Sequence, residues 1–89
     1  MTRKIYKYPL AIEPHQEVTM PRGAKVLCFM NQYETPVLWA EVDPDERSET
    51  RLFHLVGTGH EVTPQQELVY IGTASFRGGG LMWHLYERV

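Results

Sequence analysis

Four histidines and a single cysteine are the residues whose side chains could ligate a metal ion. The histidines stand at positions 15, 54, 60 and 84 and form none of the short-spaced pairs that mark a local metal site. Neighbouring strands could still bring His54 and His84 together with Cys28, as a nitrogen and sulfur site suited to zinc or copper. Half-buried histidines that are hydrogen-bonded within a sheet fit the same positions. We favour this second interpretation and expect no metal and no other cofactor.

Side chains that could act in catalysis are present, but they lack the context that catalysis needs. Cys28 lies within the most apolar run of the chain, where a buried thiol is unreactive. Ser75 lacks the G-x-S-x-G context of a nucleophile elbow. A group of carboxylates fits a solvated turn better than a hydrolase pair: Asp43, Asp45, Glu46 and Glu49. The sequence therefore predicts that the protein is not an enzyme.

Two glycine-rich turns are the candidate ligand sites. The first contains Gly57, Thr58, Gly59 and His60, which offer backbone N–H groups, a hydroxyl and an imidazole. The second contains Arg77, Gly78, Gly79 and Gly80, which place N–H groups beside a guanidinium. Such loops can form anion-binding nests, so a small anionic ligand such as a nucleotide signal is one expectation. Neither turn matches a phosphate-binding loop, and ordinary hairpin chemistry is the structural alternative.

Aromatic side chains are the third candidate for a binding surface. They make up 11% of the residues, and two of them are tryptophans. They include Tyr6, Tyr8, Tyr33, Trp39, Tyr70, Phe76, Trp83 and Tyr86. Most of these rings should pack in the core. Because Tyr and Trp are frequent anchors of interfaces, a patch that exposes Trp39 or Trp83 would mark a partner or subunit interface.

Length, composition and charge restrict the class of protein. The chain has 89 residues, of which 43% are hydrophobic and 22% are charged, so we expect one globular domain spanning residues 1–89. A domain of this size has a thin core, and self-association into a homo-oligomer would help to stabilise it. The formal net charge of −2 lacks the basic excess of a nucleic-acid-binding protein, which argues against nucleic acid as a partner.

Cysteine content and the N-terminal residues bear on the compartment. A single cysteine cannot form a disulfide within the chain, so a secreted disulfide scaffold is excluded. The first residues are polar and aromatic and lack the apolar core of a signal peptide. No apolar run approaches the ~20 residues that cross a bilayer. We therefore expect a cytoplasmic protein that does not bind membranes.

Seven β-type segments separated by turn residues set the expected fold. They cover residues 4–10, 16–20, 24–30, 37–42, 51–56, 68–76 and 81–86. We expect an all-β domain of six to seven short strands, as a small antiparallel sandwich or a partly open barrel.

Particular residues refine this expectation. Pro9 predicts that the first segment is an edge strand, whereas the nearly continuous apolar sequence of residues 24–30 predicts a central strand. Residues 31–36 are expected to form a polar loop, and Gly72 predicts a bulge or a close backbone approach. Residues 63–67 form the one short helical turn that the sequence allows, or else a plain loop.

In addition, the chain resembles a family of small, uncharacterised phage and prophage proteins. The matching segments are KIYKYPL (residues 4–10), MPRGA (20–24), LWAEVD (38–43), VGTGH (56–60), YIGT (70–73) and HLYE (84–87). They follow one another in order and cover nearly the whole chain. The family is a domain of unknown function, so the resemblance implies no catalytic residues. It does imply a phage or prophage gene that acts in an infected bacterial cell.

Three functions remain as expectations, in order of preference. The first is a non-enzymatic accessory protein that binds a host bacterial protein and inhibits a process such as a defence system, by analogy with other small phage proteins. The second is a binder or sponge for a nucleotide signal at the glycine-rich turns. The third is a minor structural or assembly component of the virion.

Overall fold

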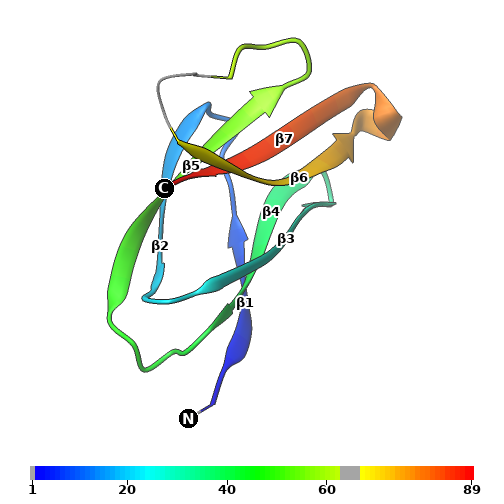
Figure 1. Ribbon diagram of the computed structural model, residues 1–89. Helices are drawn as coiled ribbons and strands as arrows, with labels where there is room; N and C mark the ends of the chain where they lie inside the picture. The colour runs from blue at the N-terminus through cyan, green and yellow to red at the C-terminus, as the bar shows by residue number, and fades with distance from the viewer. Residues whose placement is uncertain (1, 63–66) are drawn as a thin grey trace.

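Alternating apolar and polar residues build seven β-strands that form two antiparallel sheets (Figure 1). The computed structural model describes residues 2–62 and 67–89. The strands are β1 (Lys4–Pro9), β2 (His15–Pro21), β3 (Lys25–Gln32), β4 (Thr35–Val42), β5 (Ser48–Gly57), β6 (Leu68–Phe76) and β7 (Leu81–Arg88). One sheet has the order β1-β4-β3 and the other the order β2-β5-β7-β6. The all-β prediction is confirmed, and of its two architectures the sandwich is the right one, since the strands do not close into a barrel.

The core lies between the two sheets and takes every second residue of the central strands. On β4 the side chains of Leu38, Ala40 and Val42 are fully buried, and on β5 Phe53 and Leu55 point inward. Leu85 of β7 completes the middle of the core. This alternation follows from the two-residue repeat of a strand, which places one face of each sheet against the other.

The edge position predicted for residues 4–10 is confirmed. β1 pairs only with β4, so that Tyr6 lies opposite Ala40 and Tyr8 opposite Leu38 on the inner face. Lys7 lies opposite Trp39 on the outer face. Pro9, which has no N–H, ends the strand, as is usual for proline at a sheet edge.

The central position predicted for residues 24–30 is wrong, because β3 lies at the edge of the three-stranded sheet. Its continuous apolar sequence has a local cause. A bulge between Val26 and Cys28 adds Leu27 as an extra residue and shifts the alternation by one position. Leu27 is 42% exposed and Met30 is 52% exposed, so one face of this apolar strand is partly open to solvent. Cys28 is also only half-buried, contrary to the prediction of a buried thiol.

The polar loop predicted for residues 31–36 is shorter than expected. β3 continues to Gln32 and β4 begins at Thr35, which leaves a two-residue turn. Tyr33 has φ 52° and Glu34 has φ 64°, the positive values that a tight hairpin turn requires. The Asn31 side chain accepts a hydrogen bond from the Glu34 N–H at 2.7 Å, and this bond stabilises the turn without a glycine.

β3 and β6, which belong to different sheets, lie side by side and close one side of the sandwich. Gly72 lies at this approach, where an added Cβ atom would make an ordinary van der Waals contact. A Cβ atom at this position would lie 3.7 Å from Cβ of Phe29, and the β6 register shifts between Tyr70 and Gly72. Both features that the sequence predicted for Gly72, a bulge and a close approach, are therefore present.

An ion pair on the inner side of the four-stranded sheet joins β5 to β7. Arg51 donates to both carboxylate oxygens of Glu87, at 2.6 and 2.8 Å, and also to the backbone oxygen of Ala24, just before β3. Such a bidentate pair holds the guanidinium in one orientation. The contact with Ala24 links the two sheets at the end of the core.

Helical structure is confined to one short turn among the described residues. It is a 3-10 turn at Arg77–Gly79, within the β6–β7 hairpin that the sequence predicts. The helical turn expected at residues 63–67 falls mostly outside the described residues. In residues 2–62 and 67–89, no helix has the length and apolar character needed to span a membrane.

Candidate functional site

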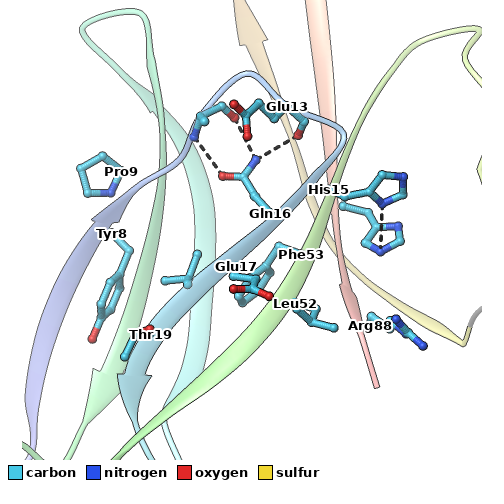
Figure 2. Close-up of a pocket in the computed structure, with 13 residues that line it drawn as sticks. Tyr8, Pro9, Glu13, His15, Gln16, Glu17, Thr19, Leu52, Phe53 and Arg88 are labelled. Carbon is cyan, nitrogen blue, oxygen red and sulfur yellow. Dashed lines mark hydrogen bonds between the residues drawn. The ribbon is translucent and has the colours of Figure 1, made fainter.

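A wide hollow lies on the side opposite the β3–β6 contact, where β1 and β2 separate into different sheets. It is an open groove of about 930 Å³. Figure 2 shows that its side chains come from β1, β2, β5 and the end of β7 and from the loop that joins β1 to β2. The lining residues are Tyr8, Pro9, Ala11, Glu13, His15, Gln16, Glu17, Val18, Thr19, Leu52, Phe53, His54 and Arg88. We call this hollow the β1–β2 groove.

The β1–β2 groove combines an apolar wall with a charged rim. Phe53, Val18 and Tyr8 belong to the core or pack against it. Burial, followed by the neighbouring Tyr6, raises the pKa of Tyr8. Its phenol therefore stays protonated at neutral pH and can donate a hydrogen bond. The carboxylates of Glu13 and Glu17 and the guanidinium of Arg88 are exposed at the rim, which leaves a net negative charge, so the groove suits a ligand that is apolar on one side and cationic on the other.

Gln16 closes one end of the groove (Figure 2). Its side-chain amide accepts a hydrogen bond from the Ala11 N–H at 2.9 Å and donates to the Ala11 carbonyl at 2.8 Å. It also donates to the carbonyl of Glu13 at 3.0 Å. An amide that bonds with both the N–H and the C=O of one residue makes the contacts that a neighbouring strand would make.

Two histidines pair across the strands at the same end of the groove. His15 of β2 lies opposite His54 of β5, with 3.4 Å between Nδ1 of His15 and Nε2 of His54. The two rings meet edge to face, with their centres 4.4 Å apart. His54 is only 5% exposed, and burial, His15 and Arg88 lower its pKa in that order of importance. The fold therefore favours the neutral form of His54.

A smaller cavity of about 90 Å³ lies on the other side of this histidine pair. His15 and His54 line both hollows, and His60 and Glu61 line only the smaller one. Within the described residues, no group of three or more His, Cys, Asp or Glu side chains is placed to hold a metal ion. The combination of His54, His84 and Cys28 does not form, because Cys28 lies in the other sheet and the two histidines bond to other partners.

The turn at residues 57–60 has a structural reason for its first glycine. A Cβ atom on Gly57 would lie 3.0 Å from the ring of His60 and 3.3 Å from the ring of Trp83. The His60 N–H donates to the Gly57 carbonyl at 3.0 Å, and Gly59 has φ +87°. Gly57 therefore lies against the rings of two other predicted site residues, His60 of the same turn and Trp83 of β7. Trp83 packs against the core beside them and is not an exposed anchor.

Thr58 of the same turn belongs to a chain of hydrogen bonds on the outer face of the four-stranded sheet. Its hydroxyl lies 2.8 Å from Nε2 of His84, and Nδ1 of His84 lies 2.8 Å from the Thr73 hydroxyl, which also bonds to the Tyr70 hydroxyl. A neutral imidazole donates through one nitrogen and accepts through the other, so these contacts occupy both nitrogens of His84. The arrangement orients the imidazole, but no carboxylate takes part in it.

The turn at residues 77–80 already binds a carboxylate of the chain itself. The Arg77 N–H lies 3.1 and 3.3 Å from the two carboxylate oxygens of Glu34. Three successive residues have positive φ: Arg77 (51°), Gly78 (65°) and Gly79 (99°). The glycines thus allow the backbone of the turn to place the Arg77 N–H against the Glu34 carboxylate. An external anion at this N–H would have to displace Glu34.

Trp39 lies in the other sheet from Trp83, on the outer face of the three-stranded sheet. Its indole Nε1 is buried without a hydrogen-bond partner, and Lys7 Nζ lies 6.0 Å from the ring centre. Trp39 and Trp83 therefore do not form one surface. The predicted site residues fall into three places: the 57–60 turn with Trp83, the 77–80 turn, and the face with Trp39.

The β1–β2 groove was missed at the level of sequence. Glu13, His15, Gln16 and Glu17 form an unremarkable polar stretch, and only the sheet topology shows that they lie at an open edge. One signal was available. Pro9 predicts an edge strand, and the turn residues after it allow the chain to cross to the second sheet, where β2 forms another edge.

These features define a class of protein, a small antiparallel β-sandwich with one closed side and one open, grooved side. The chain belongs to the family described as Domain of unknown function (DUF7352), whose model matches residues 1–89. No curated protein and no solved structure matches the chain. The expected membership of a family of unknown function is confirmed, whereas the phage or prophage origin stays a prediction.

Proposed function

We propose that the protein is a non-enzymatic binding protein whose ligand is another protein, held at the β1–β2 groove. As its setting, we propose a phage or prophage accessory role in which the ligand is a host bacterial protein, for example a component of a defence system. The resemblance described above supports the setting, and the groove supports the mode of action. The two parts are tested separately.

The observation that carries the proposal is the open groove of about 930 Å³ between two edge strands. Small-molecule sites usually enclose most of their ligand, whereas this groove is open to solvent along the strand edges. Its apolar wall and carboxylate rim resemble the division of a protein interface into an apolar centre and a polar rim. A peptide segment is the ligand that fits an open groove of this kind.

The glycine-rich turns give less support to the alternative of a small anionic ligand. The Arg77 N–H of the 77–80 turn already bonds to Glu34. In the 57–60 turn, Gly57 lies against the rings of His60 and Trp83. At the groove rim, the two carboxylates of Glu13 and Glu17 outweigh the single guanidinium of Arg88, and this net negative charge disfavours an anion there. The observations thus favour a protein ligand over a nucleotide.

Capture from bacterial lysate with a matched pair of variants tests the proposal. Glu17→Arg reverses an exposed charge at the groove rim, and Glu46→Arg makes the same change in the loop between β4 and β5, outside the groove. We expect the wild-type protein and the Glu46→Arg variant to retain the same bacterial protein, and Glu17→Arg to lose it by 10-fold or more. Equal retention by both variants, or no protein retained by the wild type, would contradict the proposal.

A further inference from the structure

The hydrogen bonds at the two ends of the β2–β5 pairing show which backbone groups of β2 face its free edge. The Leu55 N–H bonds to the Pro14 carbonyl at 3.0 Å, and the Arg22 N–H bonds to the Arg47 carbonyl at 2.8 Å. In an antiparallel pair, bonded and non-bonded rungs alternate. The even-numbered residues of β2 therefore bond to β5. The N–H and C=O groups of His15, Glu17 and Thr19 point away from β5, toward the open side.

The same reasoning applies to β1. The Leu10 N–H bonds to the Pro36 carbonyl at 2.9 Å, so Tyr6 and Tyr8 bond to β4 while Ile5, Lys7 and Pro9 face outward. Ala11 continues this outward series, and its two backbone groups are the ones that the Gln16 amide occupies. At the end of the groove that Gln16 closes, its amide group thus already occupies the space beside the Ala11 backbone.

We propose that an extended segment of a partner protein enters this gap and pairs with the free edge of β2. The inference rests on the function proposed above and names the form of the ligand. A segment of about five residues spans His15 to Thr19 and makes about six backbone hydrogen bonds with their outward groups. The Gln16 amide makes a similar two-bond contact with the backbone of Ala11, just beyond the end of β1.

The two edges differ in how well they are protected, and the difference selects β2. Natural proteins block exposed edges with lysine and proline. β1 carries Lys4 and Lys7 and ends in Pro9, which has no N–H to offer. β2 also ends in a proline, Pro21, but it carries no lysine, so the lysines are what distinguishes the two edges. β2 is therefore the edge left open to pairing.

Charge and burial specify the side chains of the partner segment. Alternate residues of a strand paired with β2 point into the groove, toward Tyr8, Val18 and Phe53, and these should be apolar. The intervening residues lie beside Glu17, with Glu13 also at the rim, and these should be lysine or arginine. The occupant is thus an extended segment in which apolar and basic residues alternate.

A synthetic peptide of alternating valine and lysine, seven residues long, provides the probe, and amide hydrogen exchange followed by NMR is the readout. We expect the peptide to slow exchange at His15, Glu17 and Thr19 by 10-fold or more. Gln16 and Val18, which already bond to β5, should change little. A peptide of alternating valine and glutamate should bind at least 10-fold more weakly. Binding without protection of the three outward amides would overturn the proposal.

Two proline variants provide a matched control. Thr19→Pro removes an outward N–H of β2, and Lys7→Pro removes an outward N–H of β1, while neither change removes a ladder bond. We expect Thr19→Pro to weaken binding of the valine–lysine peptide by 5-fold or more and Lys7→Pro to leave it unchanged. Circular dichroism and thermal melting confirm that each variant folds. If either one does not, the same peptide with N-methyl groups on alternate residues replaces it and should fail to bind.

Three outcomes separate this inference from related ones. Sedimentation equilibrium without peptide tests a second copy of the chain as the occupant. A dimer that protects the same three amides would overturn the proposal of a foreign segment. If the peptide fails while capture of a bacterial protein still depends on Glu17, strand pairing is wrong and the proposed function stands. If both fail, the groove has no role in binding.

Discussion

Each side of the sandwich carries one side-chain carboxamide with three hydrogen bonds, and the two differ in what they join. On the closed side, Asn31 of β3 donates to the Ser75 carbonyl of β6 and bonds to the backbone N–H and the carboxylate of Glu34. On the open side, Gln16 bonds only to the loop that precedes it. The closed side thus satisfies its polar groups across the two sheets, whereas the open side leaves strand edges unpaired.

The comparison indicates why glycine content and sheet topology point to different places. The glycine-rich 77–80 turn lies at the closed side, where it meets Glu34. Glycine there allows the positive φ angles of the turn. The open side contains no glycine among its groove-lining residues and offers backbone groups of ordinary residues. An exposed strand edge is made by topology and leaves little trace in local composition.

The largest expected difference between the two sides is in core packing. Phe29 is buried at the closed side, and Phe29→Ala should lower the free energy of unfolding by about 3–5 kcal/mol. Tyr8 is half-buried in the groove wall, and Tyr8→Ala should cost about 1–2 kcal/mol. Urea denaturation of both variants measures the difference. Equal losses would mean that the two sides are packed equally well.

The two carboxamides provide a smaller and sharper comparison. Asn31→Ala should destabilise the fold by about 1–2 kcal/mol, because it removes a link between the sheets and leaves the Ser75 carbonyl without that partner. Gln16→Ala should cost about 1 kcal/mol or less, because its bonds are local. Thermal or urea unfolding of the two variants tests the order. A larger loss for Gln16→Ala would reverse the assignment of closed and open sides.

Acid should lower the free energy of unfolding through His54, which lines the groove on the open side. The pKa of His54 is lowered in the folded protein, so the neutral form is favoured on folding. The resulting stability is complete above the unfolded pKa of about 6.5 and is lost as the pH falls through the lower folded value. Unfolding free energies between pH 5 and 8 should decrease on the acid side for the wild type. His54→Gln should reduce this dependence, and His84→Gln, the control, should leave it in place.

The smallest effect is expected at the start of β1. Arg3 and Glu41 form an ion pair of 2.7 Å between Nε and Oε2, with both side chains more than one third exposed. Pairs of this kind contribute little, so Arg3→Ala should change stability by less than about 0.5 kcal/mol. A thermal melt is sufficient to check this. A loss above 1 kcal/mol would show that the β1 edge is held more tightly than its exposure suggests.

Much of the fold follows from local pattern. The seven strands, the hairpin at residues 77–80 and the bulge near Gly72 were all predicted, because each depends on alternation or on turn residues within a few positions. The position of β3 could not be predicted, since the bulge at Leu27 gives an edge strand the continuous apolar sequence of a central one. The short β3–β4 turn was missed because Tyr33 and Glu34 adopt positive φ without glycine.

The candidate site depended on contacts that are distant in sequence. His15 meets His54 only through the register of β2 with β5, and Glu34 meets Arg77 only because the two hairpins lie at the same side. The groove itself follows from the order of strands in two sheets, which alternation does not determine. Local signals could therefore identify the elements, but not the edge that remains unpaired.

Site-specific photo-crosslinking tests the central claim, that the open side binds the partner, most directly. A benzophenone-bearing residue is placed either at position 19, on the β2 edge, or at position 58, in the exposed 57–60 turn. Both proteins are expressed in bacterial cells and irradiated. The account predicts a covalent adduct with one bacterial protein from position 19 and none from position 58. An adduct from position 58 alone would place the binding surface at the glycine-rich turn and contradict the account.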